Sequence, residues 1–163
     1  QVGIPLIETE DAWVINVAID GADQVDPQLN LMKGGGGALL QEKIVAASAR
    51  QFIVVVDYTK QVPHLGNSFP LPIEVIPFGW GSTARQLEAV GGKALLRERN
   101  GEVFRTEAGH YIVDLRLGAI HHPAALETQL NQIPGVVETG LFVGRTSLLV
   151  VASPDGVIVR PAS

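Results

Sequence analysis

The sequence of 163 residues contains no cysteine, which excludes a disulfide framework and a thiolate metal site. No apolar run reaches the roughly 20 residues that a helix needs to cross a bilayer, and no signal-peptide pattern opens the chain. Basic residues are outnumbered, with 12 lysines and arginines against 17 acids and a formal net charge of -5. Without a basic run, nucleic acid is not an expected partner. We therefore expect a cytoplasmic protein that binds neither nucleic acid nor membranes.

The apolar content predicts a folded α/β protein. Apolar residues make up 46% of the chain and charged residues 18%, a composition that argues against disorder. Residues 13–19 and 52–56 are nearly all apolar and rich in β-branched types, which predicts strands covered on both faces of a parallel sheet. Between them, residues 38–49 are rich in Ala and Leu and predict a helix. Strand, helix and strand in this order predict a parallel sheet with helices on its faces.

The pattern changes after a proline-rich connector over residues 63–72. The order becomes strand, helix, two strands, helix, strand, which is the split βαβ pattern of a ferredoxin-like unit. The expected helices are 81–91 and 123–132, and the expected strands are 72–77, 93–98 with 103–106, 111–117 and 136–143.

The last strands predict how the chain divides into domains. Residues 147–152 and 157–159 flank a turn and are expected to rejoin the first sheet. We therefore expect a sheet domain made of 1–70 and 146–163, with a ferredoxin-like α+β domain inserted over 71–145.

Acidic residues follow the two apolar strands. Asp20 ends the first strand, Asp23 lies in the turn after it, and Asp57 ends the second strand. Ligands of open parallel sheets bind outside the carboxyl ends of the strands, so these acids indicate a site there. The alternative is that Asp20 and Asp23 are ordinary turn residues, because aspartate is common in turns.

A run of four glycines, Gly34 to Gly37, follows Lys33 and precedes the expected helix. Four glycines cost conformational entropy on folding, and one reason to keep them is close approach of the backbone to a ligand. A glycine turn at a helix start presents N–H groups that favour anions, and Lys33 adds a positive charge. The run could also be a flexible loop. It matches neither the Walker nor the dinucleotide pattern, so no nucleotide is expected.

Glu42 is the candidate general base on the expected helix. Its neighbours three and four residues away are apolar, so partial burial would raise its pKa, whereas the nearby helix N-terminus would lower it. Lys43 has equally apolar neighbours, so the pattern does not single out Glu42. The four histidines show no spacing typical of metal ligands, so no metal is expected: they are His64, His110, His121 and His122.

These residues lie in motifs that resemble the A-type ribose-5-phosphate isomerases in order and spacing. The motifs are Asp20-Gly21-Ala22-Asp23, residues 33–39 with Glu42-Lys43, Asp57-x-x-Lys60, and the segments 71–77, 133–137, 140–142 and 154–156. The resemblance extends along essentially the whole chain. It implies a Rossmann-like parallel sheet domain with an inserted ferredoxin-like lid, an aldose-ketose isomerase activity on ribose 5-phosphate and ribulose 5-phosphate, and a homodimer or homotetramer.

The resemblance also implies a role for each motif residue. Glu42 would carry a proton between C1 and C2, and Lys33 would stabilise the charge on the enediolate oxygen. Asp20 and Asp23 would bind sugar hydroxyls and assist ring opening, and Lys60 would contact the substrate near its phosphate. The turn residues completing the substrate site would be Gly21, Ala22, Gly34, Gly35 and Gly36. No metal or organic cofactor is implied, since a carboxylate, an ammonium and glycine amides supply the base and the oxyanion stabilisation.

The chain departs from the family at three places. Gln24 stands where the family often has Glu, and Thr59 replaces a common Ser. The family normally begins with an additional strand and a phosphate loop, which residues 1–12 do not match, although 4–7 is strand-like. We therefore expect a shortened chain with an exposed sheet edge and uncertain activity.

The alternatives to an isomerase are a sugar-phosphate sensor, which could dispense with Glu42, and an inactive fragment.

Overall fold

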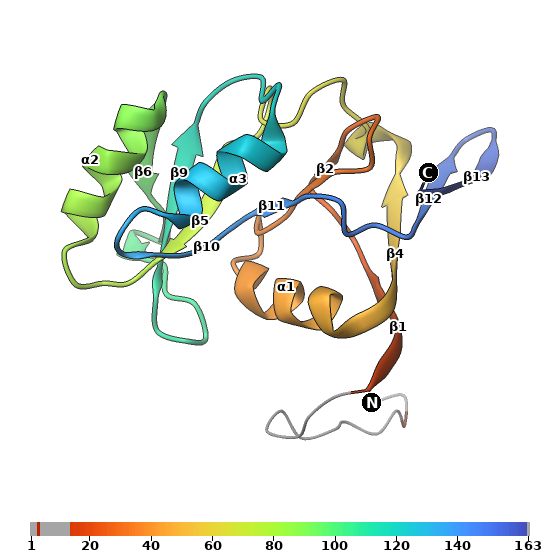
Figure 1. The fold of residues 1–163 in the computed structure, drawn as a ribbon, viewed down its shortest axis with the longest axis horizontal. Helices are drawn as coiled ribbons and strands as arrows, with labels where there is room; N and C mark the ends of the chain where they lie inside the picture. Colours follow the sequence, from red (N-terminus) through yellow and green to blue (C-terminus); the bar gives the residue numbers. More distant parts are fainter. Residues whose placement is uncertain (1–2, 4–13, 163) are drawn as a thin grey trace.

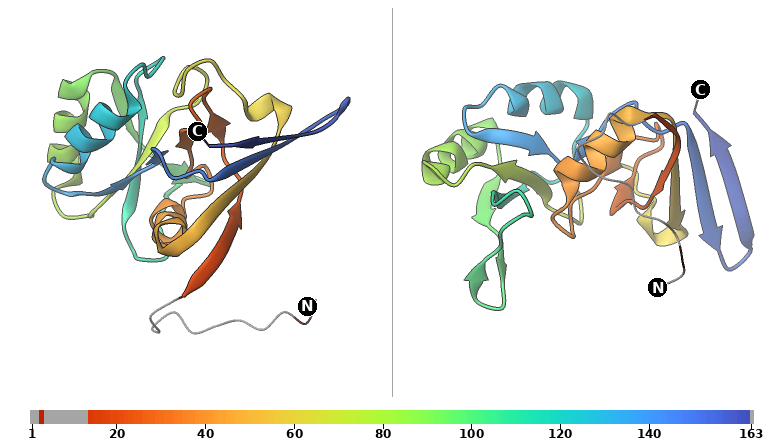
Figure 2. Two further views of the ribbon diagram at one scale, coloured as in Figure 1. Left: turned by 45° about the vertical axis from the view of Figure 1, so that its right-hand side comes forward. Right: turned by 90° about the horizontal axis from the view of Figure 1, so that it is seen from below.

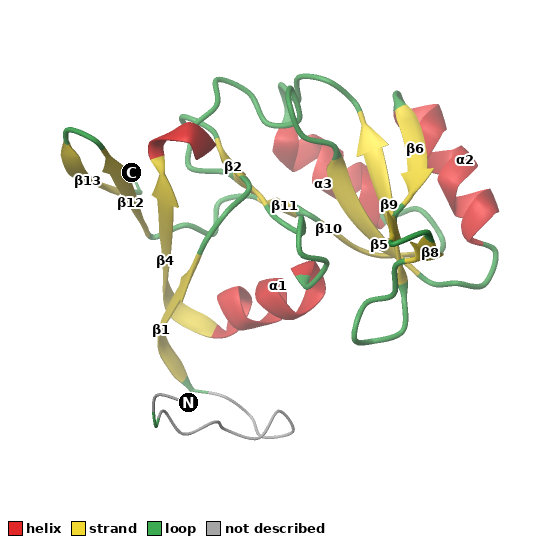
Figure 3. Cartoon of the chain, turned by 180° about the vertical axis from the view of Figure 1, so that it is seen from behind, coloured by secondary structure: helices red, strands yellow, loops and turns green. Residues whose placement is uncertain are grey.

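The computed structural model describes residue 3 and residues 14–162. The strand-like run at 4–7 lies outside the described residues. The chain forms two four-stranded sheets with helix α1 between them, as the ribbon shows from the front and from behind (Figure 1, Figure 3). None of the described helices is long and apolar enough to span a bilayer.

The first sheet has the predicted parallel βαβ core. Its strand order is β1 (Ile15–Asp20), β4 (Ala49–Asp57), β12 (Leu148–Ser153) and β13 (Gly156–Pro161). The first three strands are parallel, and β13 runs antiparallel to β12 at the edge. Helix α1 (Leu39–Ser48) forms the crossover from β1 to β4. The chain therefore has the Rossmann-like α/β fold, and the C-terminal strands rejoin the first sheet as expected.

Only one face of this sheet is buried, which corrects the prediction of strands covered on both faces. Ala18, Phe52, Val54 and Val151 alternate with exposed neighbours and face an apolar cluster that includes Ala46 of α1. On the opposite face Ile19 is 68% exposed. Apolar composition predicted burial on two sides, but the described residues supply packing partners on one side alone.

The second sheet is antiparallel and has the order β10 (Val136–Thr139), β5 (Leu71–Val75), β9 (Tyr111–Arg116) and β6 (Lys93–Leu96). Helices α2 (Trp80–Val90) and α3 (Pro123–Asn131) connect these strands in the predicted ferredoxin-like sequence. A hairpin of β7 (Glu98–Arg99) and β8 (Glu102–Val103) projects from this sheet (Figure 2). Its turn uses Asn100 and Gly101, both with positive φ.

A small third sheet joins the two larger ones. It consists of β2 (Gln24–Val25), β3 (Leu31–Met32) and β11 (Leu141–Phe142). The predicted strand over 136–143 is therefore split at Gly140, and the segment 24–32 contains a short hairpin of β2 and β3. The Gly140 N–H donates to the Pro72 carbonyl at 2.7 Å, and its own carbonyl accepts from the Lys33 N–H at 2.8 Å. A side chain at position 140 would overlap the Lys33 backbone oxygen, so glycine is required there.

Candidate active site

All the predicted site residues except Lys60 meet in one open cavity at the carboxyl end of β1. The cavity has a volume of about 270 Å³ and is lined by Asp20, Gly21, Ala22, Asp23, Lys33, Gly34, Gly35, Gly36 and Glu42. Three segments contribute these residues: the turn after β1, the glycine turn after β3, and the first turns of α1. The carboxyl end of a parallel strand beside a helix start is where this fold class binds ligands.

Lys33 is the centre of this cavity. Its side chain is 4% exposed, and its ammonium donates to the Gly21 carbonyl at 2.6 Å. The same nitrogen lies 3.1 Å from Asp20 Oδ2 and 3.3 Å from Glu42 Oε2. The backbone bonds at Gly140 hold the lysine at the junction of the sheets. The ammonium is therefore held between the carboxylates of Asp20, at the end of β1, and Glu42, on α1.

Glu42 has an environment suited to a base. Burial raises the pKa of its carboxyl above the ordinary range; the Lys33 ammonium opposes this rise, and the charges of Asp20 and Asp23 add to it. Its Oε2 is buried and pairs with Lys33 without a well-aligned hydrogen bond.

The structure distinguishes Glu42 from Lys43, which the helix pattern could not do. The Lys43 ammonium points to the other side of α1, where it pairs with Glu138 at 2.8 Å and Glu127 at 2.9 Å. These partners lie on β10 and α3 of the second sheet. Lys43 therefore anchors the helix, and Glu42 alone of the two faces the cavity.

Asp23 holds the glycine turn. Its Oδ2 accepts the Gly35 N–H at 2.8 Å, and a side chain at position 35 would collide with this carboxylate. Gly34 and Gly37 have φ values of 105° and 92°, which favour glycine. The glycine run is therefore an ordered turn, and the alternative of a flexible loop is not what the structure contains.

Lys60 does not line this cavity. It lies at the end of a short 3₁₀ turn, η1 (Tyr58–Lys60), beyond the carboxyl end of β4. Asp57 caps that turn, and the hydrogen bonds donated by the Thr59 hydroxyl and N–H lower the pKa of its carboxyl. Asp20 and Val54 are paired in the parallel register, so Lys60 lies on the same edge of the sheet as the cavity.

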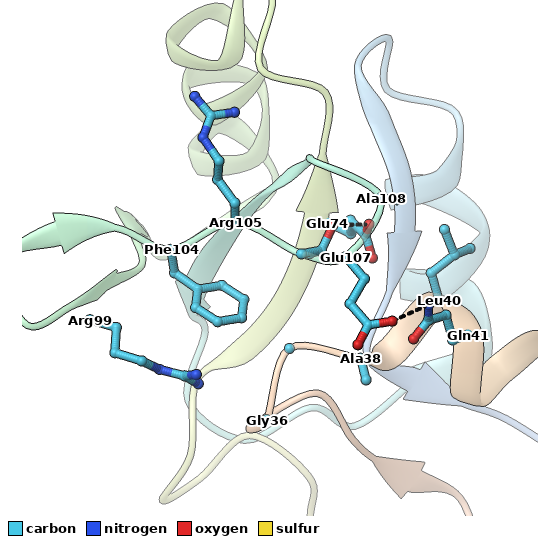
Figure 4. A pocket seen from close by; sticks show the side chains of 12 residues that line it. Gly36, Ala38, Leu40, Gln41, Glu74, Arg99, Phe104, Arg105, Glu107 and Ala108 are labelled. Atoms are coloured by element: carbon cyan, nitrogen blue, oxygen red, sulfur yellow. Dashed lines mark hydrogen bonds between the residues drawn. The ribbon is translucent and has the colours of Figure 1, made fainter.

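Sequence reasoning missed the residues that hold the glycine turn from behind. Arg97, between β6 and β7, donates to the carbonyls of Gly34 and Gly35. Phe104 packs over Gly37 so closely that a Cβ at Gly37 would overlap its ring. A second cavity, of about 270 Å³, lies on this side, between Phe104 and Arg99 of the hairpin and Gln41 of α1 (Figure 4). Nothing in the local sequence links Arg97 to a turn more than 60 residues away.

The histidines do not form a metal site. His64 and His121 make an edge-to-face pair with ring centroids 4.5 Å apart, and His110 Nδ1 lies 2.9 Å from Glu74 Oε1. Within the described residues, no group of three or more His, Asp and Glu side chains is placed to hold a metal ion.

Comparison with known proteins identifies close relatives. Residues 1–156 match the family model for ribose 5-phosphate isomerase A (phosphoriboisomerase A). The chain is 51% identical to ribose-5-phosphate isomerase A of Chloroflexus aurantiacus, covering 96% of this chain and 66% of the relative. It is 53% identical to that of Gloeobacter violaceus, covering 99% of this chain and 70% of the relative. The chain thus spans about two thirds of the length of these relatives.

Solved structures show the same similarity. The ribose 5-phosphate isomerase from Plasmodium falciparum superposes with a TM-score of 0.93 at 36% identity, covering 98% of this chain and 71% of that one. A D-ribose-5-phosphate isomerase in complex with phospho-erythronic acid gives a TM-score of 0.87 at 42% identity, covering 91% of this chain and 66% of that one.

Proposed function

The chain belongs to the ribose 5-phosphate isomerase A family, and from this premise we propose that it interconverts ribose 5-phosphate and ribulose 5-phosphate through an enediolate. The observation that carries the proposal is the Glu42 carboxylate, half-buried and 3.3 Å from the Lys33 ammonium in a cavity floored by a glycine turn. A base beside a cation and free amides is what proton transfer next to a carbonyl requires.

The proposed reaction moves protons and no other atoms. Glu42 removes the proton from C2 of the open-chain aldose, and the electron pair of that C–H bond forms the C1–C2 double bond while negative charge develops on O1. The Lys33 ammonium stabilises this oxygen. The proton on Glu42 then returns to C1, and transfer of the hydroxyl proton from O2 to O1 completes the ketose. Asp20, 3.1 Å from Lys33, is placed to accept and return that hydroxyl proton.

Two further assignments belong to this proposal. Asp23 binds a sugar hydroxyl with the carboxylate that also holds Gly35, so it shapes the turn and the substrate site together. Lys60 contacts the substrate at its phosphate end, because it lies on the cavity's edge of the sheet yet outside the cavity itself. A lysine there supplies the positive charge that a phosphate favours.

We further propose a homodimer or homotetramer that uses the lid. Phe78, before α2, is 90% exposed, and Ile76 on the same loop is 37% exposed, as is common at interfaces. Sedimentation velocity tests the oligomeric state, and a monomer over the micromolar range would contradict the proposal.

A cytoplasmic location is proposed as well, since a charged sugar phosphate does not cross a bilayer unaided.

The first test is Glu42→Gln, which keeps the size of the side chain and removes the base. We expect the turnover of ribose 5-phosphate to fall by about a hundredfold to ten-thousandfold, the usual contribution of a general base, while phospho-erythronic acid still binds. A coupled assay of ribulose 5-phosphate formation measures the rate, and calorimetry measures binding.

Two controls accompany this test. Glu107→Gln alters an exposed carboxylate that accepts a hydrogen bond from Gln41, a neighbour of Glu42 on α1. This variant should leave turnover unchanged. The Gloeobacter violaceus relative serves as the positive control of the assay. Normal turnover by Glu42→Gln would disprove the assigned base. Binding of sugar phosphate by the unsubstituted chain without turnover would instead support the sensor hypothesis.

A further inference from the structure

We propose that Arg97 is a positioning residue that aims the N–H of Gly36 at the developing enediolate oxygen, an inference that rests on the proposed isomerase function. Arg97 reaches the glycine turn from the ferredoxin-like lid and contacts its backbone on the side opposite the cavity. No substrate contact is assigned to it.

The guanidinium of Arg97 joins two parts of the molecule with four hydrogen bonds. Nη1 donates to the Gly34 carbonyl at 2.7 Å and to the Gly35 carbonyl at 3.1 Å. Nε and Nη2 donate to the two oxygens of Asp114 at 2.9 Å and 2.5 Å. The Arg97 side chain is 12% exposed and that of Asp114 19%. A bidentate pair of this kind fixes the plane of the guanidinium.

Peptide geometry converts this contact into an orientation of the amides. In a planar trans peptide the N–H points away from the carbonyl of the preceding residue. The Gly34 carbonyl faces Arg97, and the N–H of the same peptide, that of Gly35, points the other way to Asp23 in the cavity. The Gly35 carbonyl also faces Arg97. The Gly36 N–H therefore points away from Arg97, as the Gly35 N–H does, and Gly36 lines both this cavity and the one beside Phe104.

The Gly36 N–H is available to a ligand. Gly36 lines the cavity that holds Lys33 and Glu42. Among residues 14–162, the Gly35 N–H donates to Asp23 and the Gly37 N–H to the Gly34 carbonyl, while no acceptor faces the Gly36 N–H. Among the same residues the Gly34 N–H has no acceptor either; of these two amides, that of Gly36 belongs to the peptide whose carbonyl Arg97 holds, so it is the one that Arg97 can aim at an oxyanion.

A glycine turn needs such support because glycine has no side chain with which to hold itself. Phe104 closes over Gly37 and Arg97 holds the two preceding carbonyls, so the hairpin side of the lid fixes the turn at three residues (Figure 4 shows Phe104 and Gly36). A charged donor on a peptide carbonyl also polarises that peptide, which strengthens its N–H as a donor.

The test separates positioning from general stability. An amide that binds charge formed in the transition state affects kcat more than KM. We expect Arg97→Met to lower kcat for ribose 5-phosphate by about tenfold to hundredfold, as misplacement of an oxyanion donor does, with KM changed by less than about threefold. Affinity for phospho-erythronic acid, whose carboxylate resembles the enediolate charge, should fall by about the same factor as kcat.

Two further variants complete the series. Arg97→Lys keeps the charge but cannot span Asp114 and both carbonyls, so it should not restore kcat. Arg85→Met removes an exposed guanidinium that bonds Ser82 on the same helix, α2, and should leave kcat unchanged. Unchanged kcat in folded Arg97→Met, or a rise in KM with constant kcat, would overturn the proposal. If Arg97→Met does not fold, Asp114→Asn is measured instead. It should lower kcat by a smaller factor than Arg97→Met, and an unchanged kcat would overturn the proposal.

A second readout does not depend on activity. The amide resonances of Gly35 and Gly36, measured without ligand, should move in Arg97→Met and stay in place in Arg85→Met. If the unsubstituted chain shows no turnover, the proposed function fails, yet these resonances still decide the positioning role. Unmoved resonances in folded Arg97→Met would overturn the role even if the isomerase activity is demonstrated.

Discussion

At the scale of single residues, the properties of the site depend on how many charges share one small cavity. Lys33 is almost fully buried, and it has two carboxylates and a carbonyl oxygen within 3.3 Å. Such a cation needs these partners to offset its desolvation. Burial is the largest cause of the raised pKa of the Glu42 carboxyl; the Lys33 ammonium opposes the rise, and the charge of Asp20 adds to it. A raised pKa suits the proposed role of a general base.

The pH dependence of turnover tests this view of Glu42. The base works when ionised, so kcat/KM should fall as the pH drops through the pKa of its carboxyl. Since burial raises that pKa, the acid limb should lie at a higher pH than for an ordinary glutamate. Rates of ribose 5-phosphate turnover between pH 4 and pH 9 measure it. An acid limb at or below the ordinary carboxyl range would contradict the environment assigned to Glu42.

At the scale of elements, helix α1 is held in place from both sides. Ala46 packs into the apolar cluster of the first sheet, while Lys43 reaches β10 and α3 of the second. Both ammonium groups approach Phe142, Lys33 at 5.6 Å and Lys43 at 4.9 Å from the ring centroid. The helix that carries the base is thus fixed relative to both sheets, which sets where Glu42 points.

Removal of the Lys43 charge should destabilise the protein. Lys43→Met keeps most of the packing but leaves Glu127 and Glu138 without their cation, each only about one fifth exposed. Loss of one partner of a buried pair costs about 3 kcal/mol of unfolding free energy. Urea denaturation measures it, with Lys93→Met on an exposed position of β6 as the control. A cost equal to that of the control would show that the network does not anchor α1.

At the scale of the whole molecule, two apolar clusters are joined by the small sheet of β2, β3 and β11. Leu31 and Phe142 of that sheet belong to the first cluster, and Met32 and Leu141 to the second. The division into residues 1–70 with 146–163 and residues 71–145 stays a prediction, because Met32 and Leu65 belong to the second cluster and Phe142 to the first. The alternation along β3 and β11 sends successive side chains to different cores, so the site lies where the two units meet.

The uncovered face of the first sheet should make the chain prone to association. We call it the open face; its exposed members include Ile19 at 68%, Val157 at 67% and Val159 at 56%, with Val17 and Val55 beside them. Apolar patches on open sheets promote self-association. The double substitution Val157→Thr and Val159→Thr should lower light scattering on concentration, with the unfolding free energy changed by less than about 0.5 kcal/mol.

Val151→Thr is the matched control for the open face, because Val151 lies on the buried face of the neighbouring strand and is 1% exposed. It should cost about 1 to 3 kcal/mol of unfolding free energy, since a hydroxyl is placed in the core. Equal scattering by the double variant and the unsubstituted chain would show that the open face does not drive association.

The sequence alone determined the order of elements, the α/β class and the motifs that meet in the cavity. Runs of β-branched residues, an Ala- and Leu-rich segment and glycine turns are local signals, and local signals fix local structure. Asp20 and Asp23 could be predicted at a site because parallel strands end at a common edge, and Lys33 and Glu42 joined them through the motifs that resemble the family. The split at Gly140 and the hairpin of β2 and β3 were too short to leave a periodic pattern.

Only the tertiary structure decided which side of α1 faces the cavity, which face of the sheet is buried and what holds the glycine turn. Glu42 and Lys43 look alike in the sequence, and the position of Glu127 and Glu138 separates them. Arg97 and Asp114 became visible only when the lid was folded against the turn. Contacts between residues far apart in the chain depend on how the elements pack, and packing leaves no spacing in the sequence from which it could be predicted.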